Sequence, residues 1–254
     1  MNFNRDKEET RPPIRFIELD ILRGCAILFM IILHIFWDLD YFSILPLNTY
    51  FYSLNIIVPV MFFLLVGICL AVNNNKYQHQ PRKMYLRMIQ RGLWILNLGI
   101  LLTLLTAVFL PDRPILFGVL HCIGCCIILS TILLRFKSTN IIFASLIIVT
   151  GLALGFLYTT EHPTMAELAT GIHESDVGKH TIDYFPILPW FGICLLGIAL
   201  GNILYRDNQR RYHIPDLSRY KPTKILSWMG QHSLAIYLIH QPLIAGVLFL
   251  IVLV

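Results

Sequence analysis

Residues 15–39 read RFIELDILRGCAILFMIILHIFWDL, an apolar run long enough to cross a bilayer that nevertheless carries ionisable side chains. Four of these lie inside or at the ends of its apolar part, residues 19–39: Asp20, Arg23, His34 and Asp38. An Arg or Asp at mid-membrane costs about 2.5–3.5 kcal/mol on insertion scales, so such residues persist where a buried polar site uses them. The stretch therefore predicts both a membrane-spanning helix and a functional site on it.

The composition of the whole chain is that of an integral membrane protein. Of its 254 residues 56% are hydrophobic and 14% are charged, and the mean hydropathy is +0.67, which excludes a soluble protein. Since no polar linker divides the chain, we expect a cytoplasmic N-terminal tail, residues 1–16, and a single transmembrane domain, residues 17–254. Membrane orientation accounts for the net charge of +5, and the chain carries no signature of nucleic-acid binding, so no nucleic-acid partner is expected. No P-loop or dinucleotide-binding motif occurs either.

Seven segments are apolar and long enough to span a membrane, which takes about 20 residues. They cover residues 17–37, 51–72, 86–109, 115–135, 140–158, 185–205 and 225–253. The last is long for one crossing, and Pro242 together with the polar run 230–233 predicts a kink or a short interfacial helix at its start. The expected fold is an all-α polytopic membrane bundle of about seven transmembrane helices.

The Lys and Arg residues predict which side of the membrane each loop faces. They cluster before the first segment and after the second, fourth and sixth. Arg113 and Lys179 are the exceptions on the opposite face, and Arg23 lies within the first segment. Because cytoplasmic loops carry the excess of basic residues, the N-terminus is expected in the cytoplasm and the C-terminus on the outer side.

This orientation predicts how far from the cytoplasmic face each polar residue of the first helix lies. Asp20 and Arg23 lie near its cytoplasmic end, whereas His34 is eleven residues beyond Arg23, about 16 Å further out at 1.5 Å per residue. Asp20 can pair with Arg23, and Asp38 lies one turn from His34, where a carboxylate can orient an imidazole. Two interpretations stay open: a structural ion pair with a hydrogen-bonded interfacial histidine, or a cation and a base that serve a reaction.

Four later stretches, together with the opening one, carry a resemblance to a known protein family. They are VPVMFFLLVGICLAV (58–72), GVLHCIGCCIIL (118–129), DYFPILPWFGICLLGIALG (183–201) and SLAIYLIHQPL (233–243). Together the five resemble the heparan-alpha-glucosaminide N-acetyltransferase catalytic-domain family in its short prokaryotic branch, which is related to transmembrane acyltransferases. In those acyltransferases an Arg, ten residues and a His recur on the first helix, and Arg23 and His34 have that spacing.

The resemblance implies an enzyme of a prokaryotic plasma membrane that transfers an acetyl group from cytoplasmic acetyl-CoA to a sugar or glycan on the other side. Coenzyme A is a polyanion, so its site needs cations at the cytoplasmic face. Arg87 and Arg91, at the start of the third helix, together with Arg23 and its neighbour Asp20, form the expected donor site. The alternative for Arg87 and Arg91 is the ordinary basic decoration of cytoplasmic loops.

At the outer side we expect His34 to act as general base with Asp38 beside it, and His121 to assist as a further catalytic residue. The residues expected to bind the acceptor are Asn55, Asp183, Tyr184, Trp190 and His240. For His121 and His240 the alternative is a hydrogen-bonded residue of the helix core. The outer loop 159–184 is polar but lacks the spacing of a zinc site, so no metal is expected.

Several alternatives remain open at this level. The acetyl group can pass directly to the acceptor or first to His34, and the product can be an N- or an O-acetyl group. A homodimer is plausible. The competing function is a multi-pass transporter or channel without acyl-transfer chemistry, although the chain lacks the paired broken helices that inverted repeats leave.

Overall fold

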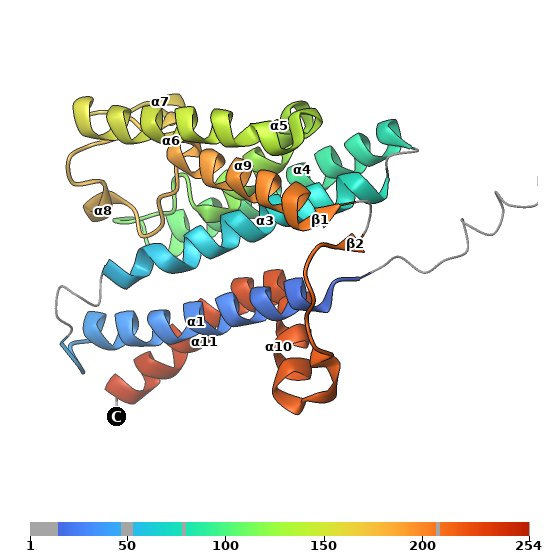
Figure 1. Ribbon diagram of the computed structural model, residues 1–254. Coiled ribbons are helices and arrows are strands. Elements are labelled where there is room, and N and C mark those ends of the chain that lie inside the picture. The colour runs from blue at the N-terminus through green and yellow to red at the C-terminus, as the bar shows by residue number, and fades with distance from the viewer. Residues whose placement is uncertain (1–14, 47–52, 78–79, 207–208, 254) are drawn as a thin grey trace, which may run out of the picture.

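The computed structural model describes residues 15–46, 53–77, 80–206 and 209–253, and helices dominate this part of the chain (Figure 1). The long helices are α1 (Ile17–Tyr41), α3 (Ile57–Lys76), α4 (Pro81–Phe109), α5 (Val119–Leu133), α6 (Asn140–Leu157), α9 (Ile187–Leu204) and α11 (Ser233–Leu253). The short ones are η1 (Leu54–Ile56), η2 (Leu134–Thr139), α7 (Met165–Thr170), α8 (Val177–His180), η3 (Leu217–Arg219) and α10 (Lys221–Gln231). The strands β1 (Tyr205–Arg206) and β2 (Gln209–Arg210) form a small antiparallel hairpin.

Six stretches of helix in the described chain are long and apolar enough to cross a membrane, and one of them has to be divided. Val119–Leu157 has 39 residues, which at 1.5 Å each is about 58 Å, roughly twice the hydrocarbon thickness. Lys137, with φ 48° and ψ −121°, interrupts the helical backbone within η2 and so separates α5 from α6. The structure is thus the all-α polytopic membrane bundle that the sequence predicts, with about seven spans.

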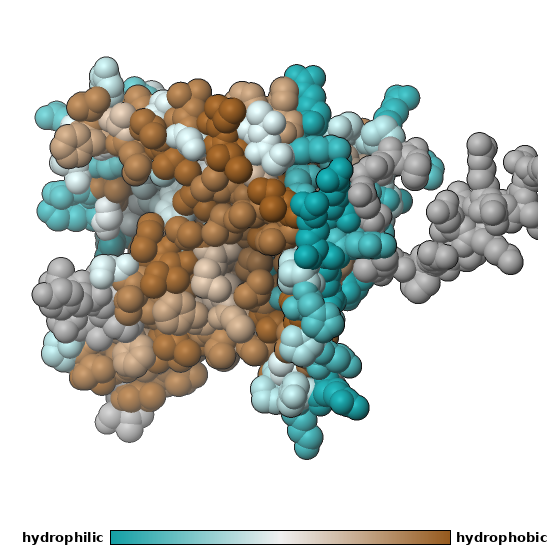
Figure 2. Space-filling model, in the orientation of Figure 1, coloured by the Kyte–Doolittle hydropathy of each residue, from teal (hydrophilic) through white to brown (hydrophobic). Residues whose placement is uncertain are grey.

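On the face seen in Figure 2, a broad hydrophobic region ends abruptly at a hydrophilic band on one side. That end holds the start of α1, the start of α4 and the β1–β2 hairpin, whereas α7, α8 and the C-terminal end of α11 lie at the other (Figure 1). The basic loops therefore gather at one end of the molecule. By the positive-inside rule this basic end is the one expected to face the cytoplasm, and the other is called the outer end below.

Glycines let two pairs of helices pack with their backbones in contact. A Cβ atom on Gly67 of α3 would overlap the carbonyl oxygen of Cys194 on α9, and one on Gly197 would overlap that of Leu64. Between α1 and α10, a Cβ on Gly24 would overlap the carbonyl of Leu226. Small residues at such crossings are how membrane helices gain packing contacts. A side chain larger than glycine at position 197 would therefore push α3 and α9 apart.

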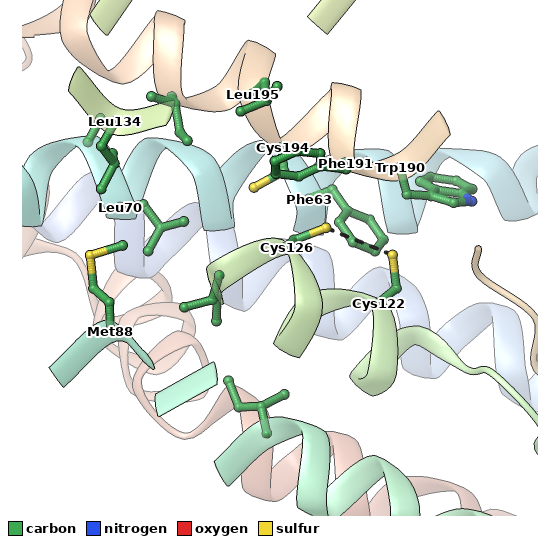
Figure 3. Packing of buried hydrophobic residues seen from close by; sticks show 14 of the residues in the cluster. Phe63, Leu70, Met88, Cys122, Cys126, Leu134, Trp190, Phe191, Cys194 and Leu195 are labelled. Carbon is green, nitrogen blue, oxygen red and sulfur yellow. Dashed lines mark hydrogen bonds between the residues drawn. The ribbon is translucent and has the colours of Figure 1, made fainter. Parts of the chain in front are cut away.

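The main core lies between α3, α4, α5 and α9 and is built from apolar side chains and cysteines (Figure 3). Phe63 packs against Trp190, with ring centroids 5.2 Å apart, and the thiols of Cys122 and Cys126 lie 3.9 Å from each other. All six cysteines are free. Cys122, Cys126 and Cys194 are buried in apolar surroundings, so these thiols act as packing groups.

The C-terminal segment is broken into two helices, as predicted. α10 ends at Gln231 and α11 begins at Ser233, with Pro242 inside α11. α10 packs on the first half of α1 and leaves Ile225 and Trp228 exposed at the edge of the bundle. This arrangement lays α11 alongside α1, and it is the contact between these two helices that builds the candidate site.

Candidate functional site

Two histidines meet between α1 and α11 towards the outer end of the bundle. The ring centroids of His34 and His240 are 4.9 Å apart, at an interplanar angle of 60°. His34 is partly buried and His240 is 7% exposed. The imidazole of His34 therefore faces α11, and the structure brings together two residues that the sequence reasoning proposed separately.

The hydrogen bonding of His240 fixes which of its ring nitrogens is free. Nδ1 lies 2.6 Å from the carbonyl oxygen of Tyr237, which can only accept, so Nδ1 carries the proton and donates. Nε2 then holds the lone pair, and it is buried without a hydrogen-bond partner among the described residues. A neutral imidazole with a free lone pair next to a second imidazole is suited to proton transfer.

Asp38 is 3% exposed and lies in the same seam between α1 and α11, but its partner is Gln241. The Gln241 amide nitrogen donates to both carboxylate oxygens of Asp38, at 2.9 and 3.1 Å. The expected pairing of Asp38 with His34 is absent from the ion pairs and hydrogen bonds of the described chain, because His34 turns towards His240. Sequence reasoning missed Gln241, although its place directly after His240 in an apolar helix was a usable signal.

A further buried histidine, His121 of α5, has a protein contact at each ring nitrogen. The Gly118 N–H donates to Nδ1 at 3.2 Å, which caps the start of α5, and Nε2 lies 3.5 Å from the Thr103 hydroxyl. Gly99 leaves room for the ring, since a Cβ there would lie 3.0 Å from Nδ1. These contacts favour the structural alternative for His121.

Asp183 also caps α5, from the loop that precedes α9. Its Oδ2 accepts a hydrogen bond from the Val119 N–H at 3.0 Å. Burial raises the pKa of Asp183 to about 6, although the hydrogen bond from Val119 acts in the opposite direction. This carboxyl group also interacts electrostatically with Tyr237 of α11.

The other three expected acceptor residues have different surroundings. The Tyr184 hydroxyl donates to the Leu168 carbonyl at 2.8 Å, and burial raises its pKa. Trp190 is buried in the core between Phe63 and Phe185. Asn55 is exposed in η1. None of these three residues has a hydrogen bond or ring contact with His34 or His240 in the described part of the chain.

At the basic end a buried carboxylate organises two arginines. Asp20 is 2% exposed and accepts from Arg15 Nε at 2.6 Å and from an Arg23 terminal nitrogen at 2.7 Å. The Nε of Arg23 is buried without a partner in the described chain. Arg23, Arg91 and Asp20 all act electrostatically on the Cys69 thiol of α3, so the side chains of α1 and α4 converge there.

One expectation about Arg87 and Arg91 is wrong. The apolar pattern placed the helix start at residue 86, but α4 begins at Pro81, because a charged first turn is stable in a helix that projects beyond the lipid. Arg87 and Arg91 therefore lie in its second and third turns, beyond the reach of the N-terminal dipole. Both are exposed, and Arg87 lies over the ring of Tyr77 at 5.5 Å from its centroid.

The start of α1 is held by a second polar cluster, which the sequence reasoning did not single out. Glu18 is buried, pairs with Arg210 of β2 at 3.0 Å, and accepts from the Tyr205 hydroxyl at 3.3 Å. The ring of Tyr205 in turn packs against that of Phe16 at an interplanar angle of 58°, and its carbonyl accepts from Asn75 of α3 at 3.0 Å. This cluster ties α1, α3 and the hairpin together at the basic end.

The outer loop has its own contacts. His180 pairs with Glu174 at 3.1 Å, and no group of His, Cys, Asp and Glu suited to a metal ion occurs among the described residues. Two open hollows, of about 340 and 260 Å³, lie against this loop; residues of α6 and α9 help to line the first, and His162 is among the residues that line the second. Neither is lined by His34 or His240.

The fold is that of a polytopic helical membrane protein, and a polar seam that holds two histidines lies between α1 and α11. The family model described as heparan-alpha-glucosaminide N-acetyltransferase, catalytic, matches residues 15–242, so the chain belongs to this family and the resemblance seen in the sequence is confirmed. Membership indicates a membrane acetyltransferase. No curated protein and no solved structure matches the chain.

Proposed function

We propose that the protein transfers an acetyl group from acetyl-CoA, bound from the cytoplasm, to the amino group of an amino sugar or glycan on the outer side of a prokaryotic plasma membrane. Family membership supports the acetyl transfer. The observation that carries the site is the contact between His34 and His240, two imidazoles 4.9 Å apart inside the outer half of the bundle. We assign the reaction to a single transmembrane domain, residues 17–254.

His34 acts as the general base. The acceptor nitrogen attacks the carbonyl carbon of the thioester, the C–N bond forms, and the C–S bond breaks. The proton lost by the amine passes to the imidazole and from there to the departing thiolate of coenzyme A, so the enzyme returns to its starting state. The free Nε2 of His240 can accept a hydrogen bond from the protonated form of His34, which stabilises that form while the thiolate leaves.

The donor enters at the basic end. Arg23 and Arg91 converge near Cys69, and Arg87 lies one turn before Arg91 on α4. Guanidinium groups bind phosphate oxygens in pairs, which suits the nucleotide end of coenzyme A. Asp20 holds Arg23 in place. The distance along α1 from Arg23 to His34 is about 16 Å, which the extended pantetheine arm of the donor would bridge.

The acceptor site lies at the outer end of the seam. Asp38 and the Nε2 of His240 are hydrogen-bond acceptors, and Asp183 adds a further carboxyl group nearby. Such a lining favours a substrate group that donates more than one hydrogen, and a primary amine does so. For this reason we propose N-acetylation rather than O-acetylation.

The test is acetyl transfer from radiolabelled acetyl-CoA to glucosamine by the purified protein in detergent. Loss of a positioned general base lowers rates by about 10²- to 10⁴-fold, so His34→Ala should fall by at least 100-fold. The matched control, His162→Ala, changes an exposed histidine of the outer loop and should leave the rate unchanged. Equal rates in His34→Ala and the wild type would contradict the proposal, and glucosamine flux without acetylation would favour a transporter.

A further inference from the structure

Gln241 of α11 is hydrogen-bonded to the side chain of Asp38 on α1 through its amide nitrogen, whereas its amide oxygen makes no hydrogen bond among the described residues. The amide nitrogen donates to Asp38, and the amide oxygen is buried without a partner among the described residues. A carboxylate can only accept, so the amide nitrogen must face Asp38 and the oxygen must point elsewhere. The orientation of this amide is therefore set by chemistry.

A buried carbonyl oxygen without a partner is rare and costly, so a ligand group that would satisfy it is the first explanation to consider. The preceding residue, His240, presents a second free acceptor, its Nε2. Both side chains reach α1, at His34 and Asp38, which lie one turn apart on one face of that helix. Two unused acceptors thus lie at the same stretch of the seam.

We propose that Gln241 positions the outer site and selects its substrate: its amide N–H holds Asp38 while its amide oxygen accepts a hydrogen bond from the N–H of the acceptor amine. This rests on the proposed function and adds a specificity residue to it. The contact with Asp38 also fixes the rotation of α11, which keeps the ring of His240 against that of His34. Gln241 acts through these neighbours and through the bound amine, and it takes no part in proton transfer.

The contact can be broken and rebuilt. Gln241→Glu places a second carboxylate against Asp38 and removes the donor, so α11 should turn away. The double variant Asp38→Asn with Gln241→Glu restores one donor and one acceptor in reversed order and leaves a carboxylate oxygen free at position 241 to accept from the amine. Gln231→Glu, the same change on the exposed face of α10, is the matched control.

We expect Gln241→Glu to raise the KM for glucosamine by about 10- to 100-fold, the range for a lost hydrogen bond to a charged group, with the KM for acetyl-CoA unchanged. The double variant should recover to within about threefold of the wild type. A purely structural contact would instead lower the amount of folded protein and leave both KM values of the folded fraction unchanged. Unchanged glucosamine KM in Gln241→Glu, or no recovery in the double variant, overturns the proposal.

A binding measurement separates this proposal from the proposed function. Should the wild type fail to acetylate glucosamine, calorimetric titration of the wild type, Gln241→Glu and the double variant with glucosamine still tests the amide contact. Weaker binding in the single variant with recovery in the double variant supports it. Binding that is equal in all three, or absent from all three, refutes it.

Discussion

Replacing Asp183 by Asn should stabilise the protein at neutral pH, even though Asp183 is hydrogen-bonded. Burial raises the pKa of Asp183 from 3.8 to about 6, in spite of the opposing hydrogen bond from Val119. Between these two values the folded protein holds a proton that the unfolded chain has released, so the free energy of unfolding decreases as the pH rises through this window. A difference of about 2 pK units corresponds to about 3 kcal/mol, which is the most that this group can cost above pH 6.

The substitution keeps an oxygen that can accept from the Val119 N–H, and Asn caps helices about as well as Asp. Thermal unfolding of the wild type and Asp183→Asn in detergent should therefore give similar melting temperatures at pH 4. At pH 7.5 the variant should melt higher by up to about 6–12 °C, at roughly 2–4 °C per kcal/mol for a chain of this size. Asp176→Asn, an exposed change in the same loop, is the control without a pH-dependent gain. Parallel melting curves for Asp183→Asn and the wild type from pH 4 to 7.5 would refute the assignment of a buried carboxyl group.

Other substitutions test separate parts of the structure. Gly197→Val drives a side chain into the backbone of α3 and should destabilise by about 1–3 kcal/mol in thermal unfolding, whereas Gly178→Ala, with open space around it, should be neutral. His121→Ala should lower the melting temperature yet keep most of kcat, because Nδ1 caps the start of α5 and Nε2 lies against Thr103 of α4; a loss as large as that of His34→Ala would contradict this. Arg91→Ala should raise the KM for acetyl-CoA about tenfold and leave the KM for glucosamine unchanged. Arg82→Ala is the neutral control. Equal effects of the Arg91 and Arg82 substitutions on the KM for acetyl-CoA would remove Arg91 from the donor site.

The fold could be predicted from the sequence because hydropathy and length are local properties. The predicted segment 17–37 became α1, and the break before α11 followed from a run of polar residues. Predicted boundaries were least accurate where a helix leaves the lipid. Charged residues are tolerated in a helix there, so the helix continues beyond the end of the apolar pattern. α4 is the example: its first turn lies outside the apolar pattern, so Arg87 and Arg91 are not at the start of the helix, where the sequence placed them.

The site was only partly predictable, because contacts between distant helices leave no periodic pattern in a sequence. The role of Arg23 and Asp20 as a pair followed from their spacing on one helix. The same reasoning paired Asp38 with His34, whereas α11 supplies a separate partner for each. Which nitrogen of His240 is free depends on a hydrogen bond to the backbone, and no residue pattern encodes that.

The measurement that bears most directly on the account is a sided transfer assay in sealed membrane vesicles. Inside-out vesicles, with the cytoplasmic face outward, are loaded with glucosamine and given radiolabelled acetyl-CoA externally, and right-side-out vesicles are treated identically. The account predicts labelled N-acetylglucosamine inside the inside-out vesicles alone, and its loss with His34→Ala. Product in the external medium, or equal labelling in both vesicle types, would contradict transfer from the basic end to the histidine pair.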